Sequence, residues 1–472
     1  MPQYADIGLI GLAVMGRNLA LNIADHGSTV AVYNRSPERT DEFLAGDARG
    51  FPILGVHSIE DLVSTLVRPR IVVLMIKAGA PVDQQIDALA PLLEPGDIII
   101  DAGNSQFMDT ERRAAHLDEL GIHFVGMGVS GGEDGARFGP SIMPGGSAEA
   151  WPDIKDIFTS IAATAEGEPC CEWVGPGGAG HYVKMVHNGI EYGDMQVIAE
   201  AYDVMRRGLG LDARDMKPIF ERWNEGRLDS FLIEITAEIM GTVDTDGTPL
   251  VDRVLDAAGQ KGTGKWTVVA SLDQATPTTL VAEAVYARIV SSMVDERRVA
   301  ARTLTGPAGT IADAPDEVIA DLEDALYASK IISYAQGFML FEAASEEFGW
   351  DLDPGTIASL WRAGCIIRSR FLADITSAYR ANRGVSSLLQ DGFFHDAVTR
   401  AEPGWRRTVA RAVHAGIPVP AYSSALAFYD GFRSERLPAS LIQAQRDSFG
   451  AHTYERIDEP RGQFFHSDWS EA

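Results

Sequence analysis

The chain has 472 residues, 46% of them hydrophobic, and a formal net charge of −27. Its length predicts two or three domains, and its acidity argues against nucleic-acid or anionic-membrane partners, because phosphate backbones bind basic surfaces. The sequence shows neither an apolar run of the ~20 residues that cross a membrane nor a basic segment leading into a hydrophobic one, so we expect a soluble, cytoplasmic protein.

The three cysteines, Cys170, Cys171 and Cys365, indicate neither a disulfide framework nor a thiolate metal centre. Their number is odd and no CxxC spacing occurs. We expect ordinary small apolar residues there, and no metal site is predicted. Because the chain is acidic, any anionic ligand has to be bound by a local cluster of Lys, Arg and His.

The first predicted elements are a strand, a glycine turn and a helix. They are Ile7–Ile10, then Gly11-Leu12-Ala13-Val14-Met15-Gly16, then a helical run to His26 closed by Gly27. Such a turn binds the pyrophosphate of a dinucleotide on the N–H groups of a helix N-terminus. The second glycine of the usual fingerprint is Ala13, and ordinary strand–helix turns also match a glycine pattern.

A second predicted strand, Thr29–Tyr33, completes a βαβ unit. The next residues are Asn34-Arg35-Ser36-Pro37, in which Ser36 is the predicted N-cap and Pro37 the first helical residue. A NAD-specific site places an acidic residue here, whereas Arg35 can pair with a 2′-phosphate and stack on adenine. We therefore predict a preference for NADP, with contacts from Asn34, Arg35 and Ser36.

Strands and helices continue to alternate up to Gly126. Strands are predicted at 71–76, 97–101 and 122–126, and helices at 81–93 and 109–120. Apolar strands between amphipathic helices favour a doubly wound parallel sheet, which binds ligands at the carboxyl ends of its strands. Two loops lie at those ends and are predicted to contact the cofactor, through Ile76, Lys77 and Ala78 and through Asn104.

Residues 128–136 contain too much glycine for a strand, and we predict a third loop on the ligand side of the sheet. A flexible turn is the alternative. The backbone donors and the hydroxyl of Ser130 favour contact with a substrate.

After a boundary at Gly175–Gly178 the strand patterns stop, and a long helix runs to about Arg207. At about 100° per residue, one face of this helix holds Lys184, His187, Asn188 and Glu191. An amine, an imidazole, a carboxamide and a carboxylate suit acid–base chemistry on a polar substrate. A solvated stripe of charges with a chance histidine produces the same pattern.

Helical periodicity continues from Asp215 to about Phe432 with one break. The break, residues 257–267, is a small-residue loop with two lysines that lacks nucleotide P-loop spacing, and we interpret it as contacting a substrate anion. A faint repeat relates residues 210–232 to residues 349–372, which favours a duplicated helical unit. From Leu437 the chain is polar but rich in large aromatics, which predicts docking on a partner subunit.

Long motifs in one order make the chain resemble the decarboxylating 6-phosphogluconate dehydrogenase family over essentially its whole length. The motifs are GLAVMG from Gly11, NRS from Asn34, VSGGEDGARFGPSIMPGG from Val129, GAGHYVKMVHNGIEYGDMQ from Gly178, AGQKGTGKWT from Ala258 and QAQRDSFGAHTYER from Gln443. The resemblance implies an α/β Rossmann-type NADP domain at 1–177, an all-helical, duplicated substrate and dimerisation domain at 178–434, and a tail at 435–472 that reaches the partner subunit of a homodimer.

The same resemblance implies the oxidative decarboxylation of 6-phospho-D-gluconate to D-ribulose 5-phosphate and CO2, with reduction of NADP to NADPH. It implies that Lys184 takes a proton from the 3-hydroxyl and later returns one to the 3-keto oxygen, and that Glu191 protonates carbon 1 of the enediol. The implied substrate contacts are Asn104, Ser130, Gly131, Gly132, His187, Asn188, Tyr192, Lys261 and Arg288, with Arg446 and His452 from the other subunit's tail.

Two alternatives stay open. Another β-hydroxyacid dehydrogenase shares the cofactor domain and the helix lysine but acts on a small 3-hydroxy acid without decarboxylation. The second helical half, Glu191 and the segment with Arg446 and His452 count against it. A non-catalytic NADP-binding regulator needs neither Lys184 nor Glu191.

Overall fold

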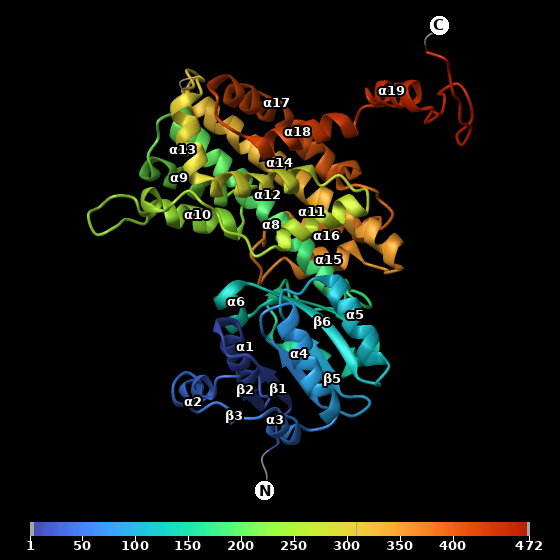
Figure 1. Ribbon diagram of the computed structural model, residues 1–472. Coiled ribbons are helices and arrows are strands. Elements are labelled where there is room, and N and C mark those ends of the chain that lie inside the picture. The colour runs from blue at the N-terminus through green and yellow to red at the C-terminus, as the bar shows by residue number, and fades with distance from the viewer. Residues whose placement is uncertain (1–3, 308, 470–472) are drawn as a thin grey trace. The chain divides into compact units, whose positions relative to one another are not determined.

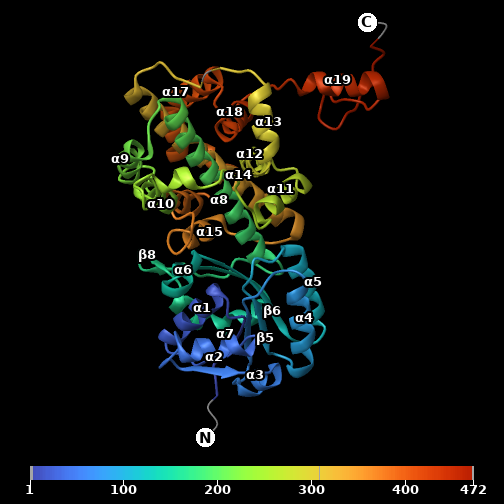
Figure 2. The same ribbon diagram turned by 60° about the vertical axis from the view of Figure 1, so that its left-hand side comes forward.

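The computed structural model describes residues 4–307 and 309–469, and the chain divides into two compact units, Met1–Ala425 and Leu426–Ala472. In the first unit an α/β part is followed by a long series of helices (Figures 1 and 2). Among the residues described, no helix combines the length and the apolar character needed to span a membrane.

The α/β part contains a seven-stranded sheet with the order β3-β2-β1-β4-β5-β6-β7. The strands are β1 (Ile7–Ile10), β2 (Val30–Tyr33), β3 (Ile53–Val56), β4 (Ile71–Leu74), β5 (Ile98–Asp101), β6 (His123–Ser130) and β7 (Ser141–Gly146). Neighbouring strands from β3 to β6 are parallel, which confirms the predicted Rossmann-type fold, but β7 is antiparallel to β6. The connection from Gly131 to Pro140 is too short for a parallel crossover, which needs about a dozen residues or more.

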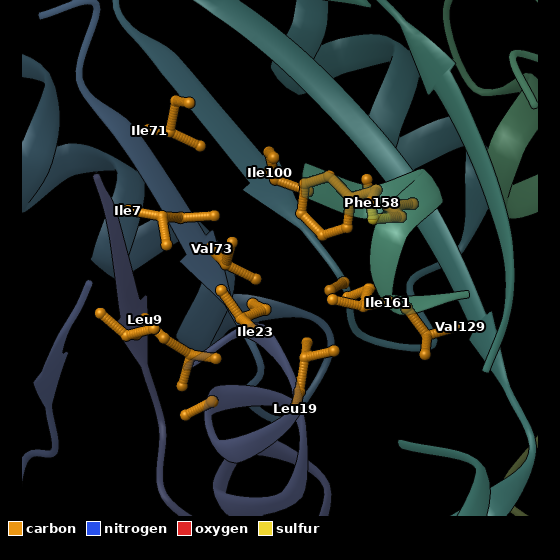
Figure 3. Close-up of a cluster of buried hydrophobic side chains, with 14 of the residues drawn as sticks. Ile7, Leu9, Leu19, Ile23, Ile71, Val73, Ile100, Val129, Phe158 and Ile161 are labelled. Carbon is orange, nitrogen blue, oxygen red and sulfur yellow. The ribbon is translucent and has the colours of Figure 1, made fainter. Parts of the chain in front are cut away.

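Helices cover both faces of this sheet. They are α1 (Val14–Asp25), α2 (Pro37–Ala45), α3 (Ile59–Thr65), α4 (Ala80–Leu89), α5 (Phe107–Asp118), α6 (Gly132–Phe138) and α7 (Trp151–Ile161). One core joins Ile7 and Leu9 of β1 to α1 and α7 (Figure 3), and the other joins Ile10 to α3, α4 and α5. Because both faces are buried, the strands are apolar without alternation.

The prediction of a loop at residues 128–136 is wrong. Strand β6 continues to Ser130 and α6 begins at Gly132. Strand β6 has glycine at positions 126 and 128 because the long helix α8 (Ala179–Asp203) packs directly on the strand. A Cβ atom on Gly128 would lie 2.5 Å from the Cβ of Lys184, and one on Gly126 would lie 2.8 Å from Nδ1 of His181. Here glycine marks the close approach of a helix.

Several local predictions also need correction. Strand β4 ends at Leu74, two residues before its predicted end, and the side chain of Ser36 makes no capping hydrogen bond although it stands at the N-cap of α2. Sequence reasoning missed β3, α3, β7, α7 and the hairpin of β8 (Thr164–Ala165) and β9 (Glu168–Pro169). Cys170, Cys171 and Cys365 are free and buried, which fits their interpretation as small apolar residues.

Helices make up the remainder of the first unit. Helix α8 continues as a π-helical turn, Val204–Gly208. Then follow α9 (Ala213–Asn224), α10 (Phe231–Gly241), α11 (Thr263–Asp273), α12 (Thr279–Ser292), α13 (Val294–Thr303), α14 (Pro315–Phe348), α15 (Pro354–Leu360), α16 (Leu372–Ala381), α17 (Gly392–Ala415) and α18 (Pro420–Phe432), which extends past the unit boundary. The predicted break at 257–267 is only partly a loop, because α11 begins at Thr263.

The order of the helices supports the duplication. Helix α8 with α9 and α10 corresponds to α14 with α15 and α16, each a long helix followed by two short ones. Ser230 and Ser369, which the repeat aligns, form an antiparallel bridge. Trp223 and Trp361, also aligned, are both fully buried.

The second unit is built around α19 (Ala439–Gly450). The buried carboxylate of Asp447 accepts hydrogen bonds from the backbone N–H groups of Thr453 and Ser467 and from the indole N–H of Trp469. The segment after α19 therefore folds back onto this helix.

Candidate active site

The glycine turn between β1 and α1 has the shape of a pyrophosphate cradle. Gly11 has φ +106°, and a Cβ there would lie 2.4 Å from the carbonyl oxygen of Met75. A Cβ on Gly16 would lie 1.9 Å from the carbonyl oxygen of Gly11. No side chain caps the N-terminus of α1, whose N-cap is Ala13. These features fit a dinucleotide, because backbone N–H groups can donate to its phosphates.

The end of β2 is joined to this turn. The side-chain oxygen of Asn34 accepts a hydrogen bond of 3.1 Å from the N–H of Leu12, and the Asn34 amide donates to the carbonyl oxygen of Ser36. Arg35 follows with an exposed side chain. A guanidinium beside the turn can pair with a 2′-phosphate.

Two further loops lie at the carboxyl ends of the adjacent parallel strands β4 and β5, one with Ile76, Lys77 and Ala78 and the other with Asn104. They touch each other, since a Cβ on Gly103 would lie 3.1 Å from the carbonyl oxygen of Ile76. This edge is where doubly wound sheets bind ligands.

The structure brings together the four residues predicted on one face of α8. Nδ1 of His187 lies 3.4 Å from Nζ of Lys184, 3.1 Å from Oδ1 of Asn188 and 3.9 Å from Oε2 of Glu191. Nε2 of His187 lies 3.2 Å from Oγ of Ser130 at the end of β6. The imidazole thus connects the helix to the sheet.

Burial shifts the pKa values of this group toward the neutral forms. It lowers the pKa of Lys184, although the negative charge of Glu191 acts in the opposite direction. Burial also lowers the pKa of His187 well below its usual value, and the charge of Lys184 adds to that shift. Burial raises the pKa of Glu191, against the effects of Lys184 and Arg288. A neutral amine is a proton acceptor, and a neutral carboxyl group is a proton donor.

A cavity of about 630 Å³ opens over this face of α8. Of the residues predicted at the site, it is lined by Met15, Asn104, Ser130, Gly131, Gly132, Lys184, Asn188, Glu191, Tyr192, Lys261 and Arg288. His187 is fully buried and supports the wall through its hydrogen bonds. Residues from the sheet, from α8 and from the loop before α11 therefore share one cavity.

Basic groups lie at one part of the wall. The guanidinium of Arg288 on α12 stacks 3.7 Å from the centroid of the Tyr192 ring and donates to the carbonyl oxygen of Gly259 at 2.8 Å. Lys261 is exposed two residues further along that loop. This arrangement offers cations to an anionic ligand.

Two predicted site residues, Arg446 and His452, belong to the second unit. Arg446 is exposed and donates to the side-chain oxygen of Gln443 at 3.0 Å. The His452 ring packs edge-on against Phe449, with 5.8 Å between centroids. Their own contacts leave both side chains accessible.

Four further wall residues, Val129, Gly259, Gln260 and Thr263, lie in the two segments predicted to contact the substrate, whereas sequence reasoning missed Met195 and Ile366. Met195 carried a usable signal, because it stands four residues after Glu191 on the same helix face. Ile366 carried none, since it comes from the second helical repeat and reaches the cavity only through the tertiary fold.

Two family models match consecutive parts of the chain. One describes the NAD binding domain of 6-phosphogluconate dehydrogenase and matches residues 6–175, and the other describes the C-terminal domain of the same enzyme and matches residues 180–469. Among curated relatives, a decarboxylating 6-phosphogluconate dehydrogenase of Saccharomyces cerevisiae is 59% identical, with 98% of this chain and 96% of the relative covered. The human enzyme is 56% identical, with 99% and 97% covered.

A solved structure gives the same result. The 6-phosphogluconate dehydrogenase of Plasmodium falciparum superposes with a TM-score of 0.93 and 43% identity, covering 98% of this chain and 100% of that one. That protein is described in complex with its cofactor NADP+ and with its substrate 6-phosphogluconate.

Proposed function

The chain belongs to the 6-phosphogluconate dehydrogenase family, and we propose that it converts 6-phosphogluconate to ribulose 5-phosphate and CO2 as NADP is reduced to NADPH. The observation that carries this proposal is the cavity in which buried Lys184 and half-buried Glu191 lie beside the end of β6, within a chain that matches the family over almost its whole length. No observation favours a β-hydroxyacid dehydrogenase for small acids or a non-catalytic regulator.

Lys184 is the proposed base. Its lowered pKa increases the fraction of neutral amine, which takes the proton from the 3-hydroxyl. The resulting ammonium then donates to the 3-keto oxygen while CO2 leaves, since a polarised carbonyl stabilises the electrons released from the carboxylate carbon. When bound, NADP supplies the hydride acceptor for carbon 3.

Glu191 is the proposed acid for the last step. Its raised pKa increases the fraction of protonated carboxyl group, and this proton goes to carbon 1 of the enediol. His187 and Asn188, together with Ser130, Gly131 and Gly132, orient the sugar acid between the two groups.

The proposed phosphate anchors are Lys261, Arg288 and Tyr192. The proposed NADP contacts are Gly11 to Gly16, Asn34, Arg35, Ser36, Ile76, Lys77, Ala78 and Asn104. Local clusters of cations thus bind two anionic ligands in a protein of net charge −27.

We also propose a homodimer in which the partner's tail completes the site with its Arg446 and His452. Large apolar side chains support it, because Leu272 and Leu304 of the helical part are 75% and 74% exposed, and Phe449 and Ile457 of the tail are 75% and 84% exposed. Exposed apolar groups in such number indicate an interface.

A cytoplasmic location is proposed as well, and the three free cysteines are typical of a reducing compartment.

The experiment is to incubate purified protein with 6-phosphogluconate and NADP and to follow NADPH absorbance and released CO2. We expect both products in equal amounts. Formation of NADPH without CO2 would favour a simple dehydrogenase. The absence of both products would favour a regulator. Lys184→Met should abolish turnover and retain NADP binding, whereas Lys265→Met, an exposed lysine on α11 outside the cavity, should behave as wild type.

The tail is tested separately. A chain ending before Arg446 should bind NADP but lose affinity for 6-phosphogluconate. Mixed dimers of this truncation with Lys184→Met chains should regain activity, because one site then combines an intact lysine with an intact tail. Verified mixed dimers without activity would contradict the shared site.

A further inference from the structure

We propose that Arg113 is a positioning residue that holds together the two loops after β4 and β5, residues 75–79 and 102–106, at the edge where cofactor and substrate meet. The proposal rests on the function proposed above. Arg113 contacts neither the cavity nor the glycine turn, and it acts through the loops.

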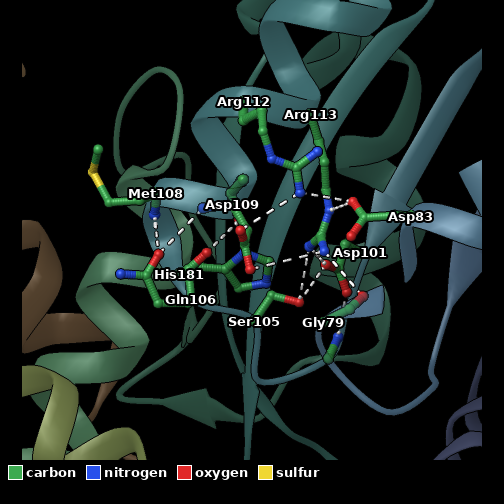
Figure 4. Close-up of polar contacts among 12 residues, drawn as sticks. Gly79, Asp83, Asp101, Ser105, Gln106, Met108, Asp109, Arg112, Arg113 and His181 are labelled. Carbon is green, nitrogen blue, oxygen red and sulfur yellow. Dashed lines mark hydrogen bonds and ion pairs between the residues drawn. The ribbon is translucent and has the colours of Figure 1, made fainter. Parts of the chain in front are cut away.

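The guanidinium of Arg113 on α5 reaches across both loops (Figure 4). Its side chain is 1% exposed. One N–H donates to the carbonyl oxygen of Gly79 at 3.1 Å, in the first loop, and another lies 3.5 Å from Oγ of Ser105 in the second. The two other hydrogen bonds go to Asp83 of α4 at 2.8 Å and to Asp101 at the end of β5 at 3.4 Å, and an ion pair of 4.0 Å joins Arg113 to Asp109 of its own helix. The planar fork of arginine suits several fixed acceptors at once.

Asp101 extends this arrangement to Asn104. Its carboxylate is fully buried and accepts from the backbone N–H of Gly103 at 3.0 Å and from the hydroxyl of Ser105 at 2.6 Å. Asp101 thus holds both neighbours of Asn104, Gly103 through its backbone and Ser105 through its hydroxyl, and Asn104 lines the cavity. Arg113 therefore positions Asn104 through Asp101, and Asn104 is proposed to contact both NADP and the sugar acid.

The same helix α5 also contacts the start of α8. Oγ1 of Thr110, three residues before Arg113, lies 2.7 Å from Nδ1 of His181, which is buried three residues before Lys184. Burial lowers the pKa of His181, and the negative charge of Asp101 acts against this shift. The loops of the cofactor edge and the helix with the proposed base are thus held by one element.

Arg112 provides a matched control on the same helix. It donates to the same carboxylate of Asp83 at 2.8 Å and pairs with Asp109, but its side chain is 57% exposed and contacts neither loop. Arg113, and to a smaller extent Arg112, lower the pKa of Asp83 to about 2. Charge pairing is therefore shared by the two arginines, whereas the loop contacts belong to Arg113.

The test compares Arg113→Lys and Arg113→Met with Arg112→Met in the full-length enzyme. NADP affinity is measured by titration without substrate, and kcat, the KM for the sugar acid and the melting temperature are measured separately. Lysine keeps the charge but cannot span all four partners. We expect both Arg113 variants to bind NADP more weakly and to lose about 100-fold in kcat, the cost of a misplacement of about 1 Å. The KM for the sugar acid should change less, because its phosphate is bound by other residues.

Arg112→Met should keep the kinetic constants of the wild type. If Arg113→Lys has the melting temperature and also the kinetic constants of the wild type, the positioning role is wrong. Failure of both Arg113 variants to fold would also overturn it, in favour of a purely structural role. A wild-type enzyme without activity on 6-phosphogluconate would instead refute the proposed function. In that case the NADP titration would still show whether the Arg113 substitutions weaken NADP binding at the two loops.

Discussion

Two glycine-rich segments border the same cavity, and they are built in opposite ways. Residues 126–132 form the end of β6, which packs against α8, and the start of α6. Residues 257–262 form an exposed loop before α11, with no strand pairing. A Cβ on Gly128 would collide with Lys184, whereas a Cβ on Gly259 would meet nothing within 4 Å. Close packing against α8 requires glycine at Gly126 and Gly128 of the first segment, whereas a left-handed backbone favours glycine at Gly262 of the second.

The two segments differ in how far they exclude water from the functional groups beside them. The packed wall carries buried groups, such as Lys184 and His187, whose pKa values shift because water is excluded. The open loop carries exposed Lys261, whose charge stays in water until an anion binds. The proposed proton transfer therefore belongs to the packed side of the cavity, and the proposed anion binding belongs to the accessible side.

Gly128→Ala should have the largest effect. The new methyl group would lie 2.5 Å from the Cβ of Lys184, so β6 and α8 have to move apart. We expect a loss of about 1–3 kcal/mol in the free energy of unfolding and loss of turnover, measured by denaturant titration and by the NADPH assay. An active variant of unchanged stability would contradict the close packing.

The second prediction concerns the pH dependence of the packed wall. Only the neutral amine of Lys184 can accept a proton, and burial lowers its pKa from the ordinary 10.5. The value of kcat/KM should therefore rise with pH through a midpoint below 10.5. Glu191 raises this pKa, so Glu191→Gln should move the midpoint of the residual activity to lower pH.

The measurement is a pH–rate profile of wild type and Glu191→Gln. A rising limb with its midpoint at the value of an exposed lysine would show that burial does not tune the base.

The smallest effects are expected in the open loop. Gly262 has φ +100°, so Gly262→Ala should cost about 1 kcal/mol and raise the KM for the sugar acid by displacing Lys261. Gly259→Ala is the matched control, because it meets no atom and needs no left-handed conformation. It should be neutral or stabilise by about 0.4–1 kcal/mol. Equal effects of the two substitutions on stability and KM would show that the left-handed backbone of Gly262 does not make it differ from Gly259.

Much of the architecture follows from local patterns. The apolar strands and amphipathic helices predict the Rossmann-type sheet, and a spacing of three and four residues predicts that Lys184, His187, Asn188 and Glu191 face one way. The glycine turn at Gly11 is also local, since a strand, a tight turn and a helix follow one another in the sequence. Local conformational preferences encode such features directly.

Other features depend on contacts that no local pattern encodes. The sequence predicts a loop at the end of β6, because glycines oppose a strand on propensity and only the packing of α8 explains them. Arg113 resembles any surface arginine in the sequence, yet it is buried among two loops and two aspartates. Ile366 lines the cavity from the second helical repeat.

The sequence by itself determined the fold class, the glycine turn and the composition of the face of α8, because each arises within one element or between consecutive elements. Only the tertiary structure decided which groups are buried, and therefore which pKa values shift. It also decided why glycine stands in β6 and which residues hold the loops of the cofactor edge. These properties depend on distances between segments far apart in the chain, and burial and close packing exist only once those segments meet.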